Sequence, residues 1–522
     1  MFKKIVPLLL VVIMVVSVFG CSTPTATTAV QPTTAVQPTA TTKPAETVTL
    51  DYYIVGTGDT PARPLVEDAI NAYIEPLIGA KVVFHIIPWA DWASKAVTGM
   101  EAGEKMDIFF TADWSNYMKL ASEGLLTPLN DDKGPNGNLL KLYGQGILTS
   151  LNPAFITGTQ IDGVNYAVPT NKELSVPWGF VYNATMADEI GFTDADAAKV
   201  KTMKDLEPWI AKAKAAHPDL YPYLTDGTVG FMLWVHAFAT NLSDYVVNTN
   251  AVPDASGKVD ESIFCPMETD WMKDYLATVH DWFTKGYINP DASLSTFDTS
   301  QVLNSGKFFI EPMPLKGNNI KAQELVIASG NADLKLKEIY GMPKVINTSD
   351  TGGSMLAIPK ASDNPVQAMK LLNLMHTDSK LINMMLYGVE GTMWKLDPDG
   401  RVNVIDSAWL GAHPGAWVWA DITIQYVTNK EDPTKNKLLI DYAKDAFFEP
   451  SLGFRFRTES VAPELAAIQT VVDGSQRALL TGYVDPAVEL PKFIQALKDA
   501  GLDKVLAEVQ KQYDAWKLAK SK

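Results

Sequence analysis

Apolar positions follow two alternating patterns from residue 47 onward. Val48–Val55, Lys81–Ile87 and Met106–Thr111 are short apolar runs rich in β-branched and aromatic residues, which predict buried strands. Between and after them, apolar residues recur three or four positions apart, which predicts helices. Because repeated strand–helix units favour parallel strands, we expect a mainly parallel sheet covered by helices. The expected helices are Leu65–Leu77, Ala90–Ala102 and Asn116–Glu123.

The same patterns continue to the C-terminus and predict an α/β chain with a helical tail. The tail begins at Ala462 and is interrupted only at 482–486. Apolar runs predict further strands at Tyr166–Pro169, Trp178–Tyr182, Phe308–Glu311 and Ser354–Ile358. Helical spacing predicts helices at Met203–Ala216, Met272–Lys285, Pro365–Met375 and Lys380–Leu386.

The length of the chain predicts more than one lobe. It has 522 residues, of which 47% are hydrophobic and 20% charged, as in ordinary globular proteins. Single hydrophobic cores stop growing near ~250–300 residues. The part that follows Cys21 is much longer than this, so we expect at least two lobes.

The N-terminus is typical of an exported lipoprotein. Lys3 and Lys4 precede the apolar run Ile5–Phe19, which is shorter than the ~20 residues that span a bilayer. Residues 18–21, which end at Cys21, resemble the bacterial lipobox. In a lipobox the cysteine is modified with acyl chains such as palmitate. We therefore expect a lipoprotein signal peptide at 1–20. An ordinary secretory signal or a transmembrane anchor are the alternatives.

Residues 21–46 predict a flexible tether, because a stretch of Thr, Pro, Ala and Val has almost nothing to bury. The hexapeptide at Thr27–Pro32 is repeated at Thr33–Pro38. An acylated Cys21 would hold the protein on the extracytoplasmic face of the cell membrane. No later segment contains 18 uninterrupted apolar residues.

Charge and composition exclude several classes of protein. A formal net charge of −16 argues against a nucleic acid or an anionic lipid surface as partner. Cys265 is the only cysteine besides Cys21, so we expect no disulfide and a buried thiol. The six histidines lack metal-ligand spacing, and no HExxH, GxSxG or Walker motif occurs. We therefore expect no metal, no cofactor and no such catalytic site.

Several segments, in this order and spacing, resemble an extracellular solute-binding protein of the maltose-binding type (family 1), in the lipoprotein branch with a DUF3502 C-terminal region. Such a protein delivers solute to the permease of an ABC transporter. The segments are Asp162–Pro169, Gly179–Asn183, Gly286–Asp291, Ser305–Lys307, Met355–Lys360, Leu386–Gly391 and Gly453–Phe456.

The resemblance implies a two-lobe fold like that of type II periplasmic binding proteins, with an inter-lobe hinge. Residues 47–179 and 355–452 would form lobe I, and residues 181–353 and 453–522 would form lobe II. Solute would be trapped between them by hinge closure. The resemblance also implies a monomer that is not an enzyme and that binds a membrane permease.

Loops after the expected strands supply the first candidate binding residues, because ligands bind beyond the carboxyl ends of parallel strands. Thr57 and Gly58 follow the first strand, although a plain turn explains them equally well. Asp113 and Trp114 follow the third, where the resemblance implies a carboxylate that accepts hydrogen bonds from sugar hydroxyls. Asp113 could instead cap the next helix.

Further candidates combine aromatic faces with polar groups near the expected cleft. The chain has 13 tryptophans, and several lie outside helical stripes. The group Trp409, Trp417 and Trp419 fits a stacking platform or core packing equally well. The remaining candidates are Lys172, Trp178, Trp234, Glu311, Glu390 and Trp394.

Aromatic faces suit the apolar faces of sugars, so an oligosaccharide is the expected solute. Peptides and aromatic metabolites fit the same side chains. A secreted glycoside hydrolase is an alternative, because paired carboxylates in an aromatic cleft would look similar in the sequence. A surface adhesin that binds glycans is a second alternative.

Overall fold

The computed structural model describes residues 47–227, 240–243, 247–249, 259, 261–340 and 344–520. These belong to one unit of the chain, 46–522. The expected signal peptide, the tether with its lipidated Cys21, and Trp234 lie outside the described residues. In the part that is described, no helix is long and apolar enough to span a membrane.

The first sheet has five strands in the order β2-β1-β3-β14-β6. β1 is parallel to β2 and β3, as the strand–helix pattern predicts, but β14 is antiparallel to both of its neighbours. Four of the five strands therefore run in the same direction, as a mainly parallel sheet requires, and β14 alone is reversed, because it belongs to a segment that returns from the second lobe. The strands are β1 (Val48–Gly56), β2 (Ala80–Pro88), β3 (Ile108–Thr111), β6 (Ala167–Pro169) and β14 (Met355–Ala357).

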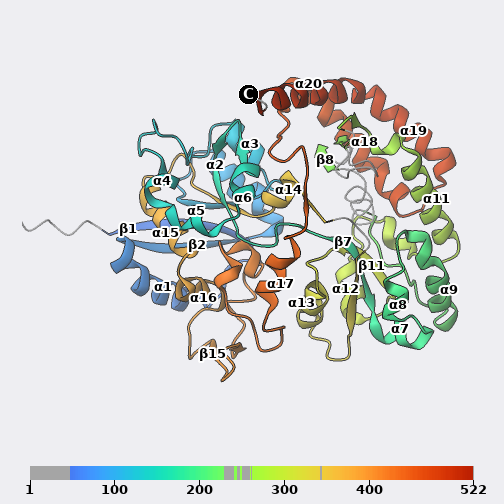
Figure 1. The fold of residues 1–522 in the computed structure, drawn as a ribbon, viewed down its shortest axis with the longest axis horizontal. Coiled ribbons are helices and arrows are strands. Elements are labelled where there is room, and N and C mark those ends of the chain that lie inside the picture. The colour runs from blue at the N-terminus through green and yellow to red at the C-terminus, as the bar shows by residue number, and fades with distance from the viewer. Residues whose placement is uncertain are drawn as a thin grey trace, which may run out of the picture. The chain divides into compact units, whose positions relative to one another are not determined.

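Amphipathic helices cover this sheet (Figure 1). Helix α1 (Arg63–Ile78) buries Val66, Ile70 and Ile74, one residue per helical turn, beside β2. It ends at Gly79, whose positive φ of 67° suits a residue without a Cβ. Helices α15 (Pro365–Met375) and α16 (Ser379–Tyr387) pack against α1 and complete this core.

The second sheet has β7 (Trp178–Asn183) at its centre, with β11 (Ile310–Pro314) and β12 (Leu336–Tyr340) antiparallel on either side. Figure 1 shows α7 (Ala184–Ile190), α8 (Asp194–Ala197), α9 (Glu207–Ala216) and α11 (Asp270–Thr284) on the side of β7 away from the first sheet, and α13 (Ile320–Ser329) on the side toward it. The other helices of this lobe and of the C-terminal tail are α12 (Thr299–Ser305), α18 (Ala462–Leu480), α19 (Pro486–Asp499) and α20 (Leu502–Lys520).

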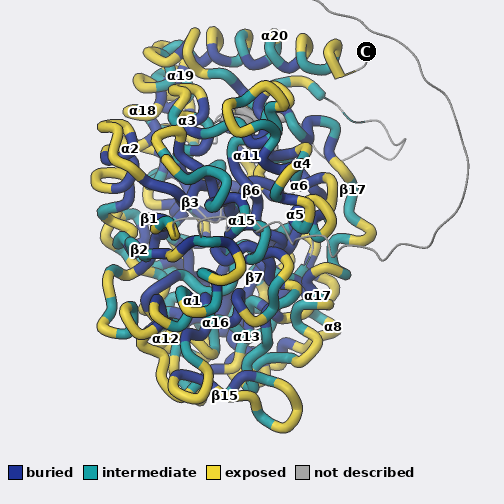
Figure 2. The backbone as a smooth tube through the Cα atoms, turned by 90° about the vertical axis from the view of Figure 1, so that its left-hand side faces the viewer, coloured by how far each residue is buried: buried dark blue, intermediate teal, exposed yellow. Residues whose placement is uncertain are grey.

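Buried apolar side chains form two main cores. Figure 2 colours the backbone by the burial of each residue. The first contains residues from Leu50 to Leu174 and again from Ile346 to Leu452. The second contains residues from Trp178 to Ile339 and again from Phe454 to Tyr513. The chain therefore crosses between the cores three times. The first two crossings come a few residues before the boundaries that the resemblance implies, since Trp178 packs in the second core and Ile346 in the first.

Most predicted elements are present, with local differences. The expected helix Ala90–Ala102 is a succession of 3-10, π and α turns, η1 (Trp89–Asp91), η2 (Trp92–Val97) and α2 (Thr98–Glu101). The expected strand at Phe308–Glu311 begins two residues later. The N–H groups of Phe309 and Ile310 both donate to the Pro222 carbonyl and not to a carbonyl of a neighbouring strand. Cys265 is buried and free, as expected.

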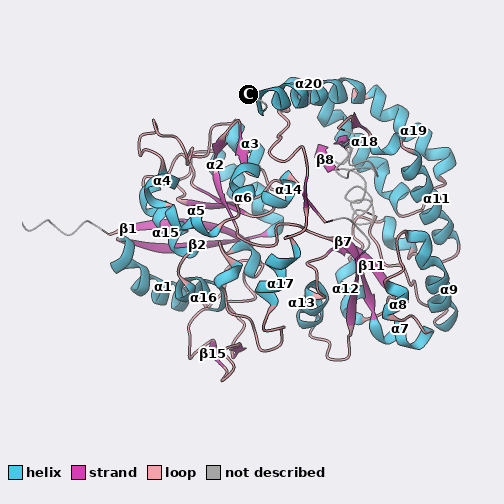
Figure 3. Cartoon of the chain, in the orientation of Figure 1, coloured by secondary structure: helices cyan, strands magenta, loops and turns pink. Residues whose placement is uncertain are grey.

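Shorter elements complete the described chain (Figure 3). The helices are α3 (Tyr117–Ser122), α4 (Leu139–Tyr143), α5 (Gln145–Ser150), α6 (Pro153–Gly158), α14 (Thr348–Thr351) and α17 (Lys435–Tyr442). The strands are β4 (Gln160–Ile161), β5 (Val164–Asn165), β8 (Thr240–Ser243), β9 (Val247–Thr249), β10 (Ile263–Phe264), β13 (Val345–Ile346), β15 (Trp394–Leu396), β16 (Val402–Val404) and β17 (Phe447–Phe448).

Candidate functional site

A cavity of about 940 Å³ lies between the two cores. Residues from both lobes line it. The part of the chain that builds the first core contributes Trp114 and the segment from Leu410 to Tyr426, and the part between the first two crossings contributes Trp178 and residues of α13. A cleft of this size accommodates a ligand of several sugar rings and encloses most of its surface.

Three tryptophans form an exposed aromatic surface at this cavity. Trp114 is 56% exposed and its ring centroid lies 6.2 Å from that of Trp417; both line the cavity. Trp89 is 44% exposed and stacks on Trp417 at 6.4 Å with an interplanar angle of 21°. Large aromatic side chains left open to water at a cavity are unusual, because their burial is worth several kcal/mol. We call Trp89, Trp114 and Trp417 the tryptophan platform.

Backbone and side-chain hydrogen bonds hold the platform. The Trp114 indole N–H donates to the Gly353 carbonyl at 2.9 Å. Thr57 supports the loop that precedes Trp417, because its N–H donates to the Ala412 carbonyl at 2.9 Å and its hydroxyl to Gly411 at 3.2 Å. Thr57 therefore contacts the loop at Gly411 and Ala412 and does not itself line the cavity. Gly58 occupies a turn with φ of 115° and does not line the cavity.

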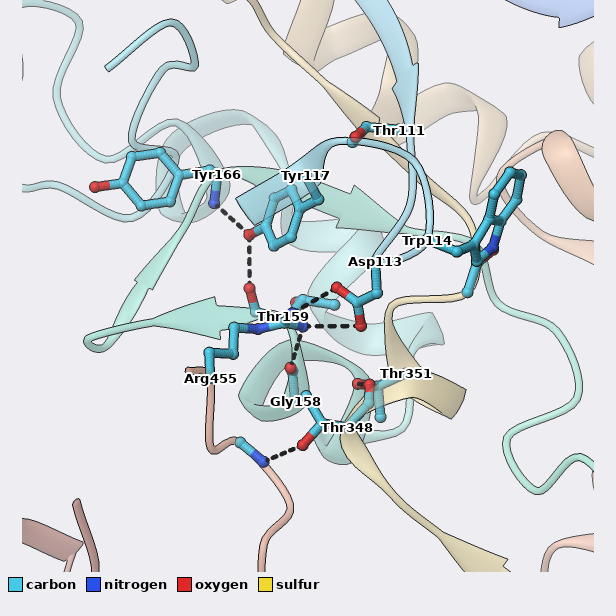
Figure 4. A network of polar contacts seen from close by, with 12 residues as sticks. Thr111, Asp113, Trp114, Tyr117, Gly158, Thr159, Tyr166, Thr348, Thr351 and Arg455 are labelled. Atoms are coloured by element: carbon cyan, nitrogen blue, oxygen red, sulfur yellow. Dashed lines mark hydrogen bonds and ion pairs between the residues drawn. The ribbon is translucent and has the colours of Figure 1, made fainter. Parts of the chain in front are cut away.

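Asp113 faces away from the cavity, toward the last crossing segment (Figure 4). Its carboxylate is held by the guanidinium of Arg455, with Nη2 3.2 Å from Oδ2 and Nη1 on Oδ1. Arg455 also donates to the Gly158 carbonyl at 2.7 Å and lies over the Tyr117 ring. The expected contact between Asp113 and a sugar hydroxyl is thus replaced by a buried ion pair that positions its neighbour Trp114.

A buried charged pair forms another wall of the cavity. Lys172 and Glu173 both line it, and Lys172 Nζ lies 3.1 Å from Glu173 Oε1. Burial alone would raise the pKa of Glu173, but the ammonium groups of Lys172 and Lys316 outweigh it and hold that pKa below its ordinary value. The second carboxylate oxygen of Glu173 is buried with no protein partner among the described residues.

An ion-pair network joins the two lobes across the cavity. Glu324 on α13 accepts from Lys316 at 2.9 Å and from Lys435 on α17 at 2.8 Å. Burial opposes the charge on Glu324, yet the two ammonium groups lower its pKa to about 2. Lys435 also pairs with Glu431. Beside this network, Ile320, Ile422 and Leu439 form a small apolar contact between α13 and the α17 region.

The other predicted site residues lie elsewhere. Glu311 is buried under β11, where burial raises its pKa to about 8, and it does not line the cavity. Glu390 is exposed and forms a bridge with Trp394. Trp394 is buried, and its indole N–H donates to the Gly388 carbonyl at 3.0 Å, so it packs in the core. Trp178 is mostly buried but does line the cavity.

Sequence reasoning missed part of the site. Trp89 directly follows β2, so the argument from strand ends applied to it as well as to Trp114. The three tryptophans that the sequence groups together have different environments in the structure. Trp417 lines the cavity, whereas Trp409 and Trp419 are fully buried. The charged residues of α13 and α17 carry no sequence signal that separates them from solvated helix faces.

The described residues contain no group of three or more His, Cys, Asp or Glu side chains that could hold a metal ion. The arrangement instead offers open aromatic faces, a free carboxylate oxygen and several ammonium groups in one cavity between two lobes. Such a site binds a polyhydroxylated ligand through stacking and hydrogen bonds.

Comparison with known proteins identifies the family. Residues 64–379, more than half of the chain, match the family model described as bacterial extracellular solute-binding protein. The chain belongs to this family. Residues 450–518 match a domain of unknown function, DUF3502, which spans Arg455 and the helices α18–α20. The family that the sequence segments imply is therefore confirmed, together with its C-terminal region.

A carbohydrate ABC transporter substrate-binding protein of Streptococcus pneumoniae serotype 4 is 30% identical over 454 residues, which are 85% of this chain and 86% of that one. The crystal structure of an N-glycan transport solute-binding protein (NgtS) from Streptococcus pneumoniae superposes with a TM-score of 0.76 and 26% identity, covering 90% of this chain and 99% of that one.

The same N-glycan transport protein solved in complex with Man5GlcNAc gives a TM-score of 0.69 at 26% identity, covering 90% of this chain and 99% of that one. The two-lobe fold of solute-binding proteins that the sequence predicts is thus confirmed by solved structures of such proteins. The relatives named here are solute-binding or substrate-binding proteins by name.

Proposed function

We propose that this protein is the substrate-binding subunit of an ABC importer and captures an oligosaccharide in the cavity between its lobes. The observation that carries the proposal is the tryptophan platform, which presents Trp114 and Trp417 to a cavity built by both lobes. The names of the similar proteins, a carbohydrate ABC transporter substrate-binding protein and an N-glycan transport solute-binding protein, support it.

In this proposal the apolar faces of sugar rings stack on Trp114 and Trp417. Trp178 closes the opposite wall, and Lys172 with Glu173 makes hydrogen bonds to sugar hydroxyls. Because the cavity is lined from both lobes, a ligand that touches both stabilises the closed arrangement over the open one. The three crossings then act as the hinge, and the closed form is what the permease recognises.

The tether and Cys21 complete the proposal. An acylated Cys21 would keep the binding lobes on the extracytoplasmic face of the cell membrane, near the permease, and residues 22–46 would span the distance. Binding without turnover follows from a role in capture and release. We therefore propose a binding protein and not a glycoside hydrolase or an adhesin.

A binding screen with product analysis tests this function. The soluble chain from residue 47 is incubated with mannose-containing and other neutral oligosaccharides, with acidic oligosaccharides and with peptides, and its thermal midpoint is measured. A ligand that binds only the folded form adds ~2.7 kcal/mol of stability at a hundredfold excess over Kd. Stabilisation by an oligosaccharide that chromatography recovers intact is expected. Cleavage of the sugar, or stabilisation by peptides alone, would overturn the proposal.

A further inference from the structure

Four lysines line the cavity, and three of them are neutralised by carboxylates. Lys172 pairs with Glu173 at 3.1 Å, and Lys316 pairs with Glu324 at 2.9 Å. Lys435 shares Glu324 and also contacts Glu431. Each of these ammonium groups therefore has its counter-charge within the protein, as buried charges require.

The fourth, Lys321, has no such partner. It lies in the first turn of α13, and among the described residues no carboxylate oxygen comes within the 4.0 Å that defines an ion pair. The nearby Glu338 is engaged elsewhere, because it accepts from the Ala322 N–H at 2.9 Å and from the Tyr340 hydroxyl. Burial and the nearby ammonium group of Lys316 lower the pKa of Lys321, and the more distant carboxylates of Glu324, Glu173 and Glu338 offset this only in part.

The remaining titratable groups of the cavity do not balance this charge. Asp350 lines the cavity, but burial raises its pKa to about 8, so it is largely protonated at neutral pH. Its carboxyl group accepts the N–H of Asn347 at 2.9 Å. His413 is neutral, because burial lowers its pKa to about 4. Among the described residues that line the cavity, four ammonium groups thus face three carboxylates, which leaves this part of the wall positive in a chain whose formal net charge is −16.

We propose that the oligosaccharide captured here is acidic and that Lys321 binds its carboxylate. This inference rests on the proposed function, since it specifies the ligand class of the same cavity. A neutral sugar would leave the unpaired ammonium group desolvated in the closed cleft, which is costly. A carboxylate supplies both the counter-charge and a charge-assisted hydrogen bond. The carboxylate can belong to a sialic acid or to a hexuronic acid, and the tryptophan platform then stacks on another ring of the same ligand.

Matched pairs of ligands test the inference and distinguish the two sources of the carboxylate. One pair is a sialylated N-glycan oligosaccharide and its desialylated form. The other is a hexuronate oligomer and its carboxyl-reduced form, in which each carboxylate has become a primary alcohol. Affinities of the chain from residue 47 are measured by calorimetry. Since a charge-assisted hydrogen bond is involved, the acidic member of one pair is expected to bind roughly tenfold or more tightly than its neutral partner.

Variants of Lys321 show whether this residue makes the distinction. Lys321→Met is expected to lower the affinity for the acidic member to that of its neutral partner, while Lys321→Arg retains the preference. Lys133→Met, at an exposed position away from the cavity, is the matched control and leaves both affinities unchanged. Thermal unfolding of each variant confirms that it folds.

The possible results separate this inference from the function on which it rests. Equal or weaker binding of both acidic members overturns the acidic ligand while oligosaccharide capture stands. A preference for the acidic member that survives in Lys321→Met overturns the role of Lys321. Failure of every oligosaccharide, neutral or acidic, to bind overturns the proposed function and this inference together.

Discussion

The Asp113 carboxylate and the Arg455 guanidinium form a two-point ion pair across 342 positions of sequence. Their side chains are 15% and 6% exposed, so both charges are largely withdrawn from water. The pair joins the end of β3 to the last crossing between the lobes, directly beside Trp114. Space for the carboxylate depends on Gly352, where a Cβ would lie 2.1 Å from Asp113 Oδ2. The DUF3502 region thereby contributes an anchor for the wall of the cavity.

We expect Asp113→Asn to destabilise the fold by ~3–5 kcal/mol, because it leaves the Arg455 charge buried without a counter-charge. Urea unfolding measures this change. The second ion pair of the same segment, Arg457 with Asp162, is the matched control, since its side chains are 35% and 77% exposed. Arg457→Gln is expected to cost only ~0–1 kcal/mol. Equal losses in the two variants would refute the assignment.

Removing the indoles that line the cavity is expected to weaken binding, and Trp114→Ala should do so without a loss of stability because Trp114 is exposed, whereas Trp417 is half-buried against the first core. Trp114→Ala and Trp417→Ala should each weaken oligosaccharide binding about tenfold or more, because each removes a stacking face. Calorimetry with the ligand found in the screen measures this loss. Trp419→Ala is the contrasting control, because Trp419 is fully buried and its removal should cost ~3–5 kcal/mol of stability. Unchanged affinity in both platform variants would exclude these side chains from the site.

Stability should fall as the pH rises from 6.5 to 8. Burial raises the pKa of Asp350 and of Glu311 to about 8, so the folded state holds protons that the unfolded chain, with ordinary carboxyl pKa values, has released. The state that binds more protons is stabilised by acid, and this stability is lost as the pH passes through the folded-state pKa. Asp350→Asn and Glu311→Gln should each flatten the dependence of the unfolding free energy on pH in this window.

The buried histidines act in the opposite direction at lower pH. Burial lowers the pKa of His376 to about 3 and that of His413 to about 4, below the ordinary value of 6.5. Between about 4 and 6.5 the unfolded chain binds protons on these two histidines that the folded state does not, while the folded state holds the protons of Asp350 and Glu311, so the two effects oppose each other there. These four groups should therefore leave the unfolding free energy nearly level in this window and lower it as the pH rises from 6.5 to 8. A monotonic rise up to pH 8 would contradict the raised carboxyl pKa values.

The contact of Glu324 with Lys435 is expected to hold α13 and α17 together. Lys435→Met removes the ammonium group that links the two lobes, while Glu324 retains Lys316. Without ligand, small-angle scattering should therefore report a larger radius of gyration, as the open population grows. Lys437→Met is the control on the same helix, because that side chain is 73% exposed and pairs only with its helix neighbour Asp441 among the described residues. Indistinguishable scattering from the two variants would count against this link.

Membrane attachment depends on Cys21 in our proposal. Cys21→Ser should yield protein that carries no acyl chain and is released from the membrane fraction, because the thiol is the acceptor of the lipid. Fractionation and mass spectrometry of the expressed protein measure both properties. Persistence of the variant in the membrane fraction would show that another segment provides the anchor.

Periodicity along the chain determined most of the elements, because strand and helix formation depend on near neighbours, and the layout of the lobes came from the resemblance to the family. β1 (Val48–Gly56) and α1 (Arg63–Ile78) lie where the apolar pattern placed them, and the tail after Ala462 is helical as predicted, although it has a second break between Asp499 and Leu502 that the pattern did not predict. The sequence also marked Trp114, since the residues after a parallel strand reach the site whatever the rest of the chain does. The direction of β14 was beyond this reasoning, because it depends on how the chain returns from the other lobe.

The tertiary structure alone decided which candidates reach the ligand cavity. Trp417 and Trp419 are two positions apart, yet one joins the tryptophan platform and the other is fully buried. Asp113 pairs with the guanidinium of Arg455, which lies 342 positions away in the sequence, so no local sequence pattern predicts this contact. In the sequence Lys321 cannot be distinguished from other helix lysines, and only the structure shows that none of the described carboxylates forms an ion pair with it. Each outcome depends on contacts between segments far apart in sequence, and the free energy of a charge or an indole is set by those contacts.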